Sequence, residues 1–183
     1  MSDMYVTTKQ IRIAGEMLRE IPEGAEAAAA RAFNRALLTV RAEATREVTK
    51  RYKVKAKDVR PTFAMKRASK SDLSAALISQ GNALPLRSFA HKPTTDTTGA
   101  KRKPIRVTIS NGKTTTLTTA FVWNRHIYGR LGEGRFPIYK MVGPSVPGML
   151  GNDNIVEEVQ SAMEEAAEKR LEHEFGRLAE GRR

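Results

Sequence analysis

Cysteine is absent from the sequence, which excludes a disulfide framework, a thiol nucleophile and a cysteine metal site. This absence suits a protein that is kept in a reducing cytoplasm. Residues 1–15 lack the basic start and apolar run of a signal peptide, and no apolar stretch is long enough to cross a bilayer. We therefore expect a chain that is made and assembled in the cytoplasm, with no membrane partner.

Signatures of catalysis are also missing. The histidines His91, His126 and His173 fall in a predicted loop, a basic turn region and an acidic helix, without the spacing of a metal-binding motif. The segment GRLGEG, residues 129–134, lacks the lysine and hydroxyl of a phosphate-binding loop and is better explained as a tight bend. The sequence therefore predicts no enzyme, no metal site and no cofactor.

Positive charge is abundant and unevenly placed, with a net charge of +12 and a pI near 10.2. Residues 41–70 hold eleven Lys or Arg against three acids, and residues 87–140 hold eleven against two, whereas residues 151–183 hold five against nine. Bases that neutralise phosphates favour nucleic acid as a partner, with an acidic protein as the second choice. A basic body with an acidic end could also pair with copies of itself, although a solvated surface is the simpler explanation.

Two long helices are predicted from apolar residues spaced three or four apart. The first follows a shorter helix over residues 9–21, begins after Pro22 and ends near Arg51. Its apolar stripe consists of Ala29, Phe33, Leu37, Val40, Ala44 and Val48. The second is a C-terminal helical extension over residues 152–181, for which Asn154 is the expected cap.

Strand patterns fill the chain between these helices. Short strands are predicted at Tyr5–Thr7, Thr62–Arg67, Leu73–Ser79, Ala120–Arg125 and Phe136–Val142, and a hairpin joins Ile105–Ser110 to Lys113–Thr119 through Asn111 and Gly112. Residues 91–103 have almost nothing to bury, so we expect a mobile basic loop there. The resulting prediction is a single α+β domain over residues 1–183, with a long N-terminal helix packed on an antiparallel sheet and an amphipathic C-terminal helix.

The stretch 126–150 combines turn formers, aromatics and bases more tightly than any other part of the chain. Gly143, Pro144 and Pro147 are expected to fix the angle at which the C-terminal helix leaves the sheet. Contacts with DNA or a protein partner are predicted for Lys53, Lys55, Lys57, Arg60, Lys101, Arg102, Lys103, Arg125, Arg130 and Arg135. Aromatic residues among these bases could stack on nucleotides, but we favour a half-buried sheet in which Phe121 and Trp123 both point into the core.

With these residues in view, the chain resembles the phage minor tail protein Z family over most of its length. The resemblance lies in RAFNRAL at 31–37, YKVKAKDVRPTF at 52–63, LPLRSF at 84–89, AFVWN at 120–124 and FPIYKMVGPSVPGML at 136–150. It implies a structural virion protein that acts in tail completion and head–tail joining near the head-proximal end of long-tailed phages. None of these segments contains a catalytic signature, so the resemblance transfers no active site.

The resemblance also implies partners. Related tail-terminating proteins form rings around the DNA channel, so we expect a homo-oligomeric ring or collar that contacts other neck and tail proteins and, nonspecifically, the phage genome DNA. Six subunits would match the usual tail symmetry, although the sequence does not count them. The alternative is a basic DNA-binding or DNA-packaging accessory protein, while a nuclease or peptidase lacks any convincing residue set.

Overall fold

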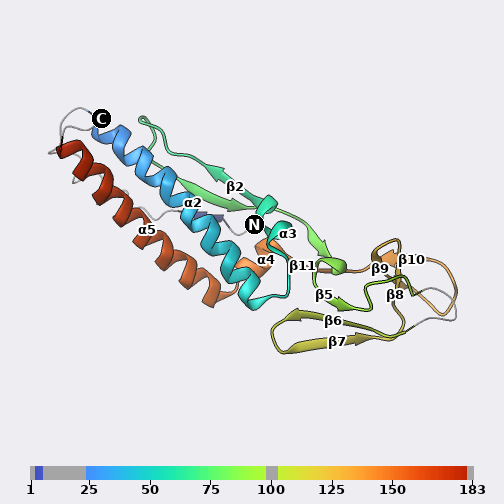
Figure 1. The fold of residues 1–183 in the computed structure, drawn as a ribbon. Helices are drawn as coiled ribbons and strands as arrows, with labels where there is room; N and C mark the ends of the chain where they lie inside the picture. Colours follow the sequence, from blue (N-terminus) through green and yellow to red (C-terminus); the bar gives the residue numbers. More distant parts are fainter. Residues whose placement is uncertain (1–2, 6–23, 98–102, 181–183) are drawn as a thin grey trace.

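The computed structural model describes residues 3–5, 24–97 and 103–180, and it shows an elongated α+β fold with a helical half and a strand half (Figure 1). The helices are α2 (Ala25–Arg51), α3 (Ala56–Val59), α4 (Val146–Leu150) and α5 (Asp153–Ala179), with 3-10 turns η1 (Arg60–Thr62) and η2 (Leu86–Ser88). The strands are β1 (Asp3–Tyr5), β2 (Phe63–Lys66), β3 (Ala76–Ser79), β4 (Ala83–Pro85), β5 (Ala90–Lys92), β6 (Ile105–Ser110), β7 (Lys113–Leu117), β8 (Phe121–Trp123), β9 (His126–Arg130), β10 (Ile138–Lys140) and β11 (Val142–Ser145). The predicted α+β class is confirmed.

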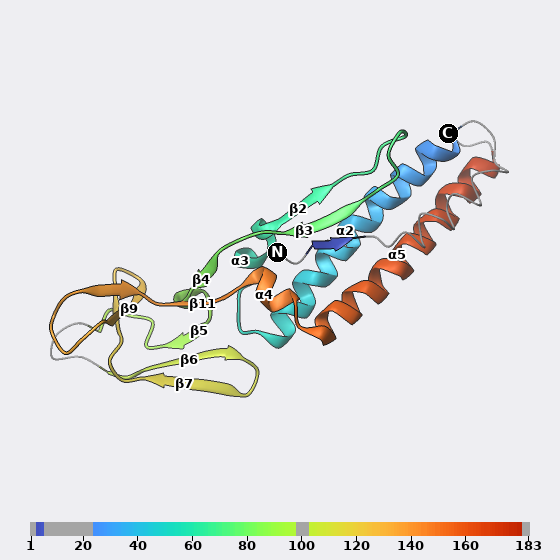
Figure 2. The same cartoon turned by 180° about the vertical axis from the view of Figure 1, so that it is seen from behind.

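Helices α2 and α5 lie side by side and form the helical half (Figures 1 and 2). Each has 27 residues, a length of roughly 40 Å. The predicted stripe of α2 is buried, and its alanines let α5 approach closely because they add little side-chain volume. On α5 the buried apolar side chains are Ile155, Val159, Met163, Ala166 and Ala167. The two long helices therefore stabilise each other, while α2 also contacts β3.

The helix ends differ in detail from the prediction. The long first helix begins at Ala25, after Gly24 adopts a left-handed conformation and accepts the backbone N–H of Ala28. The second begins at Asp153, and its N-cap is Asn152 rather than the predicted Asn154, because the Asn152 carbonyl accepts two backbone N–H groups of the first turn. The helix predicted over residues 9–21 lies outside the described residues.

A buried carboxylate joins the two long helices. Glu174 on α5 is 1% exposed and accepts hydrogen bonds from Nε of Arg31 at 2.9 Å and Nη1 of Arg35 at 2.8 Å, both on α2. Burial alone raises the pKa of the Glu174 carboxyl, but the hydrogen bond from Arg31 and the charges of Arg35, Arg31 and Arg177 outweigh it and hold that pKa below its usual value. At this position the acidic C-terminal helix meets the basic surface of its own chain.

The strands pair antiparallel, as predicted, and they divide among four small sheets. The sheet β1-β3-β2 covers part of α2 in the helical half, whereas β5-β6-β7 and β8-β9-β10 form the strand half (Figure 1). The two-stranded sheet β11-β4 lies between the halves (Figure 2). A hydrophobic cluster of buried residues extends from α2 and α5 through this region to Val122 and Ile127 of the strand half.

The junction between the halves is closely packed. Tyr52 and Val54, just after α2, form isolated β-bridges with Ser110 and Phe89. Gly143 on β11 lies against the Phe89 ring, and a Cβ built on it would be 2.6 Å from Cε2 of that ring. Only glycine fits this close approach without a shift of the ring.

Several strand predictions are confirmed and others are corrected. The hairpin through Asn111 and Gly112 is confirmed, with Gly112 at φ 80°. The strand predicted at Ala120–Arg125 stops at Trp123, because Asn124 and Arg125 have positive φ values of 46° and 61° and reverse the chain into β9. This reversal adds a hairpin that the sequence did not predict.

The basic loop predicted at 91–103 and the last predicted strand also have different bounds. His91 and Lys92 belong to β5. Thr97 is buried, its backbone N–H donates to the Val122 carbonyl, and its hydroxyl accepts the Val122 N–H. Residues 98–102 lie outside the described residues. The strand predicted at Phe136–Val142 shrinks to β10, and β11 begins at Val142 and continues through Gly143 and Pro144, because this segment pairs with β4.

Candidate functional site

The strand half ends in a face that combines aromatic and basic side chains. Tyr128 on β9 is its centre, with ring centroids 5.9 Å from Phe121, 5.6 Å from Trp123 and 6.2 Å from His126. The antiparallel register places Phe121 and Lys140 on either side of Tyr128, and it pairs Trp123 with His126. Because side chains alternate along a strand, these residues share one side of the sheet, which we call the aromatic face.

The prediction that Phe121 and Trp123 both point into the core is wrong for Trp123. The Trp123 side chain is 49% exposed, whereas Phe121 is buried beneath neighbours on the same face. The side chains that enter the core from this sheet are Val122 and Ile127, which pair across β8 and β9. All three residues of β8 are apolar, so the sequence shows no alternation of apolar and polar residues that would indicate which side of the strand is buried.

Exposed apolar side chains gather at the same end of the molecule. Among the described residues, the large hydrophobic side chains that stay exposed are Trp123, Leu131, Phe136 and Tyr139 in this region, Val142 at the start of β11 and Leu38 on α2. Leu131 and Phe136 are 73% and 70% exposed and flank the bend between β9 and β10. The glycines of this bend are evident in the sequence, but the exposure of Leu131 beside them was not predicted. Such a concentration is typical of an interaction surface.

The predicted basic residues of this end have distinct roles. Arg130 lies 5.2 Å from the Phe121 ring centroid and donates hydrogen bonds from Nη1 to the carbonyls of Gly134 and Arg135, so it holds the bend together. Arg135 is exposed, 5.8 Å from the Phe136 ring centroid, and Arg125 is exposed in the turn after β8. Arg135 and Arg125 therefore remain available to a partner, whereas Arg130 is occupied by the fold.

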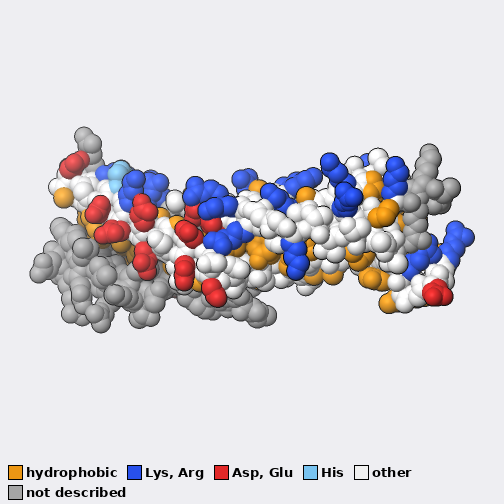
Figure 3. Space-filling view, turned by 90° about the horizontal axis from the view of Figure 1, so that it is seen from below, with side chains coloured by type: hydrophobic (Ala, Val, Ile, Leu, Met, Phe, Trp, Pro, Cys, Tyr) orange, Lys and Arg blue, Asp and Glu red, His pale blue; other side chains and the backbone are white. Residues whose placement is uncertain are grey.

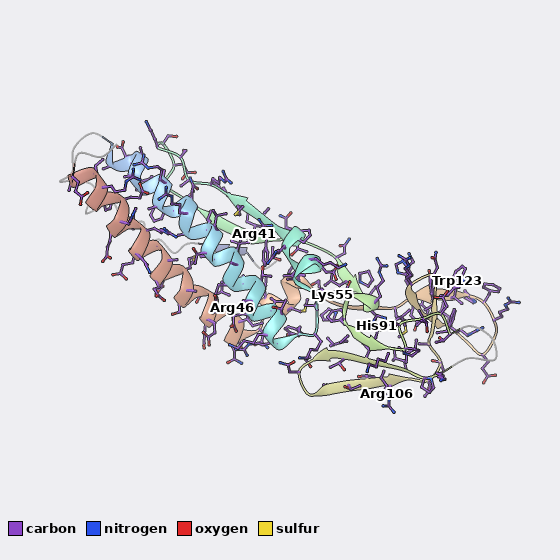
Figure 4. All side chains as sticks on the ribbon, in the orientation of Figure 1. Arg41, Arg46, Lys55, His91, Arg106 and Trp123 are labelled. Atoms are coloured by element: carbon purple, nitrogen blue, oxygen red, sulfur yellow. The ribbon has the colours of Figure 1, made fainter. Side chains whose placement is uncertain are left out.

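The other predicted basic residues lie elsewhere. Lys53, Lys55, Lys57 and Arg60 are exposed around α3 at the junction, and Figure 4 shows Lys55 well separated from Trp123. The Lys53 backbone pairs with Ile109 and Ala90, but its side chain is exposed. Lys103 is exposed just before β6, and Lys101 and Arg102 lie outside the described residues. The described residues among the predicted contacts thus lie in separate places, around the junction, at the strand end and, for Lys103, just before β6.

Charge is separated along the molecule. On the face drawn in Figure 3, most acidic side chains lie over the helical end, with several bases among them, and basic side chains predominate along the rest. The acids of the helical end include exposed glutamates of α5. Within the described ranges, no group of His, Cys, Asp and Glu could hold a metal ion, and no helix is long and apolar enough to span a membrane.

Comparison with known proteins assigns the family. The family model of prophage minor tail protein Z matches residues 9–178. The chain belongs to the minor tail protein Z family. It is a structural protein of a phage tail, and this family points away from an enzyme. No curated protein and no solved structure matches it.

Three of the five segments that first suggested the minor tail protein Z family converge at the junction. Residues 52–63 and 84–89 meet where Val54 bridges to Phe89. Residues 136–150 join them where the Leu86 N–H donates to the Met141 carbonyl at 2.9 Å. The family resemblance thus includes the packing that fixes the strand half on the helical half.

His126 of this tail protein should stay uncharged at neutral pH. Burial first, and then the charges of Arg87 and Lys140, lower its pKa below the usual value of 6.5. Because the unfolded chain takes up the proton first on acidification, His126 should contribute stability above about pH 6.5 that is lost as the pH falls. In an NMR titration His126 should protonate at lower pH than a model histidine, and Lys140→Ala should raise its pKa; an unchanged value in that variant would contradict the assigned charge effect.

Proposed function

We propose that the protein completes the tail and joins it to the head at the head-proximal end, as a homo-oligomeric ring around the DNA channel. The observation that supports this most directly is the elongated shape of the protein, which exposes acids on the outer side of α5 and bases along much of the remaining surface (Figure 3). Subunits with different charge on different surfaces can associate through heterologous contacts, which close into rings under cyclic symmetry. Six copies would match the symmetry usual for tails of this kind.

Electron microscopy tests this proposal directly. The purified protein should form closed rings, and particles assembled without it should have unfinished necks or unjoined heads and tails. Restoring the protein to those particles should restore the joined form. Exclusively monomeric protein, together with normal necks in its absence, would rule the proposal out.

A DNA-binding or DNA-packaging accessory is the second candidate, and the exposed bases at the junction favour it. Lys53, Lys55, Lys57 and Arg60 are all exposed and could neutralise phosphates of a duplex. The test is a salt titration with free duplex DNA. Strong binding that weakens steeply with salt would favour the accessory role, whereas negligible binding by protein that still incorporates into tails would favour the structural role.

Replacing both Pro144 and Pro147 with alanine should reduce incorporation into tails while changing stability by only about 1 kcal/mol. Pro144 lies on β11, and Pro147 lies in the first turn of α4, where the Gly148 N–H donates to the Ser145 hydroxyl at 3.1 Å. Both prolines restrict the backbone that leads from the strand half to α5. Copies per tail can be measured by quantitative mass spectrometry, with Pro104→Ala in the exposed segment before β6 as a matched control. Normal incorporation of the double variant would mean that the prolines do not set the assembly geometry.

A further inference from the structure

We propose that the strand end docks onto a different virion protein, whose contacting surface combines carboxylates with an apolar pocket. The docking surface consists of the exposed part of the aromatic face, with Trp123, Tyr128 and Lys140, and of the adjoining bend, with Leu131, Arg135 and Phe136. This inference rests on the proposed role in head–tail joining, and it adds which end of the protomer makes the contact and what chemistry the partner offers.

The exposed aliphatic and aromatic side chains favour a protein over DNA. Leu131 and Phe136 are 73% and 70% exposed on the bend, and the Arg135 guanidinium lies 5.8 Å from the Phe136 ring centroid. Burying them in a partner would remove apolar surface from water, at roughly 25 cal/mol for each Å². Phosphates offer no comparable gain, and Trp, Tyr and Arg together are typical of the centres of protein interfaces.

The charges of the same surface require an acidic partner. Lys140 lies on the aromatic face beside Tyr128, and Arg135 extends from the bend. Arg125 is exposed at the turn next to Trp123, and Glu133 is the acidic residue of the bend. Arg87 and Lys140 also lie close enough to His126 for their charges to lower the pKa of its imidazole, after the larger effect of burial. A partner that places carboxylates around an apolar pocket would satisfy both the bases and the exposed apolar side chains.

A second copy of this chain fits the docking surface poorly. The described acidic surface of the chain is the outer side of α5, and the apolar side chains of that helix, such as Ile155, Val159 and Met163, are buried against the rest of the helical half. That side of α5 therefore offers carboxylates without a pocket for Trp123 or Phe136. For this reason the structure assigns the docking surface to a different protein.

The experiment measures docking of purified protein onto particles assembled without it. The double variant Trp123→Ser with Phe136→Ser should bind these particles at least about tenfold more weakly, since two large apolar contacts are lost. Leu38→Ser is the matched control, because Leu38 is 53% exposed on α2 and lies outside the docking surface. Arg135→Glu with Lys140→Glu should also weaken docking, whereas Arg135→Lys should retain most of it. Because Arg135 and Lys140 are exposed, these charge variants test the surface even if the apolar pair reduces folding.

Each outcome decides the inference. Weak docking of both sets of variants, with rings still visible by electron microscopy, supports it. Wild-type docking by the variants overturns it, as does loss of the ring itself, which would make the surface a contact between copies. Normal docking with lost affinity for duplex DNA would assign the surface to nucleic acid and also overturn it. If the wild-type protein forms no ring but the variants still lose docking, the proposed ring is wrong and the proposed docking surface is still supported.

Discussion

Replacing Glu174 with alanine should lower the free energy of unfolding by about 2–4 kcal/mol, because it removes a buried carboxylate that joins α2 and α5. The carboxylate is 1% exposed, and its two oxygens accept separate hydrogen bonds from Arg31 and Arg35. Both arginine side chains are nearly half exposed, at 47% and 46%, so they can be rehydrated when the partner is lost. The expected loss is therefore smaller than that for a fully buried ion pair.

The measurement is equilibrium denaturation by urea, followed by the helical circular dichroism signal. Glu174→Gln keeps the shape of the side chain and removes its charge, so it should lose less stability than Glu174→Ala. Glu172→Gln on the exposed side of α5 is the matched control and should stay within about 0.5 kcal/mol of wild type. Equal midpoints for Glu174→Ala and wild type would show that the helix pair does not depend on this carboxylate.

The stability gained from Glu174 should also depend on pH. Because the folded-state pKa of Glu174 lies below its ordinary value, the ionised carboxylate stabilises the fold above about pH 4.5. That contribution is lost as the pH falls through the folded-state pKa. The difference in stability between wild type and Glu174→Gln should therefore be largest near neutral pH and shrink in acid. A constant difference down to strongly acidic pH would mean that ionisation of Glu174 does not stabilise the helix pair.

Replacing Gly143 with alanine should lower the free energy of unfolding by about 1–3 kcal/mol, because the added methyl group overpacks the junction. The new Cβ would lie 2.6 Å from Cε2 of Phe89, closer than such atoms approach in proteins. Phe89 is 2% exposed and belongs to the core, so its ring has little room to move. Thermal and urea denaturation of the purified variant should both show the loss.

Gly176→Ala supplies the contrasting control. Gly176 lies within α5, and a Cβ there would have no atom within 4 Å apart from the nearby backbone of its own helix. This substitution should raise stability by about 0.5–1 kcal/mol, because alanine favours the helix more than glycine does. Combining Gly143→Ala with Phe89→Leu should cost less than the sum of the two single changes, since the smaller side chain makes room for the methyl group. Strict additivity would contradict the proposed clash.

The helices and the Asn111–Gly112 hairpin could be predicted from the sequence because their signals are local. The stripe of α2 repeats at helical spacing, and the hairpin has a turn pair between two extended runs. The pairing of β11 with β4 could not be predicted in this way, since it joins segments far apart in the chain and has an irregular register. The division into four sheets is likewise set by distant contacts.

The basic residues of the candidate site could be predicted from the sequence, but their arrangement in space could not. It named Arg125, Arg130 and Arg135, but it did not separate the arginine that closes the bend from the two that remain exposed. It also placed Trp123 in the core, because β8 is apolar on both sides. Glu174 had no local signal among the acids of α5, since its partner Arg31 is 143 residues away. Contacts of this kind depend on how the helices are brought together.

The strands β4 and β11 give the protein a mechanical property. Strand β4 leads from the helical half into the strand half, and β11 returns from the strand half to α4, so both strands cross the junction as continuous backbone (Figure 2). Tension along the long axis is therefore borne by covalent bonds, and the hydrogen bonds between the two strands need not break. A load along this axis is therefore transmitted from one end of the protein to the other through the backbone of both strands.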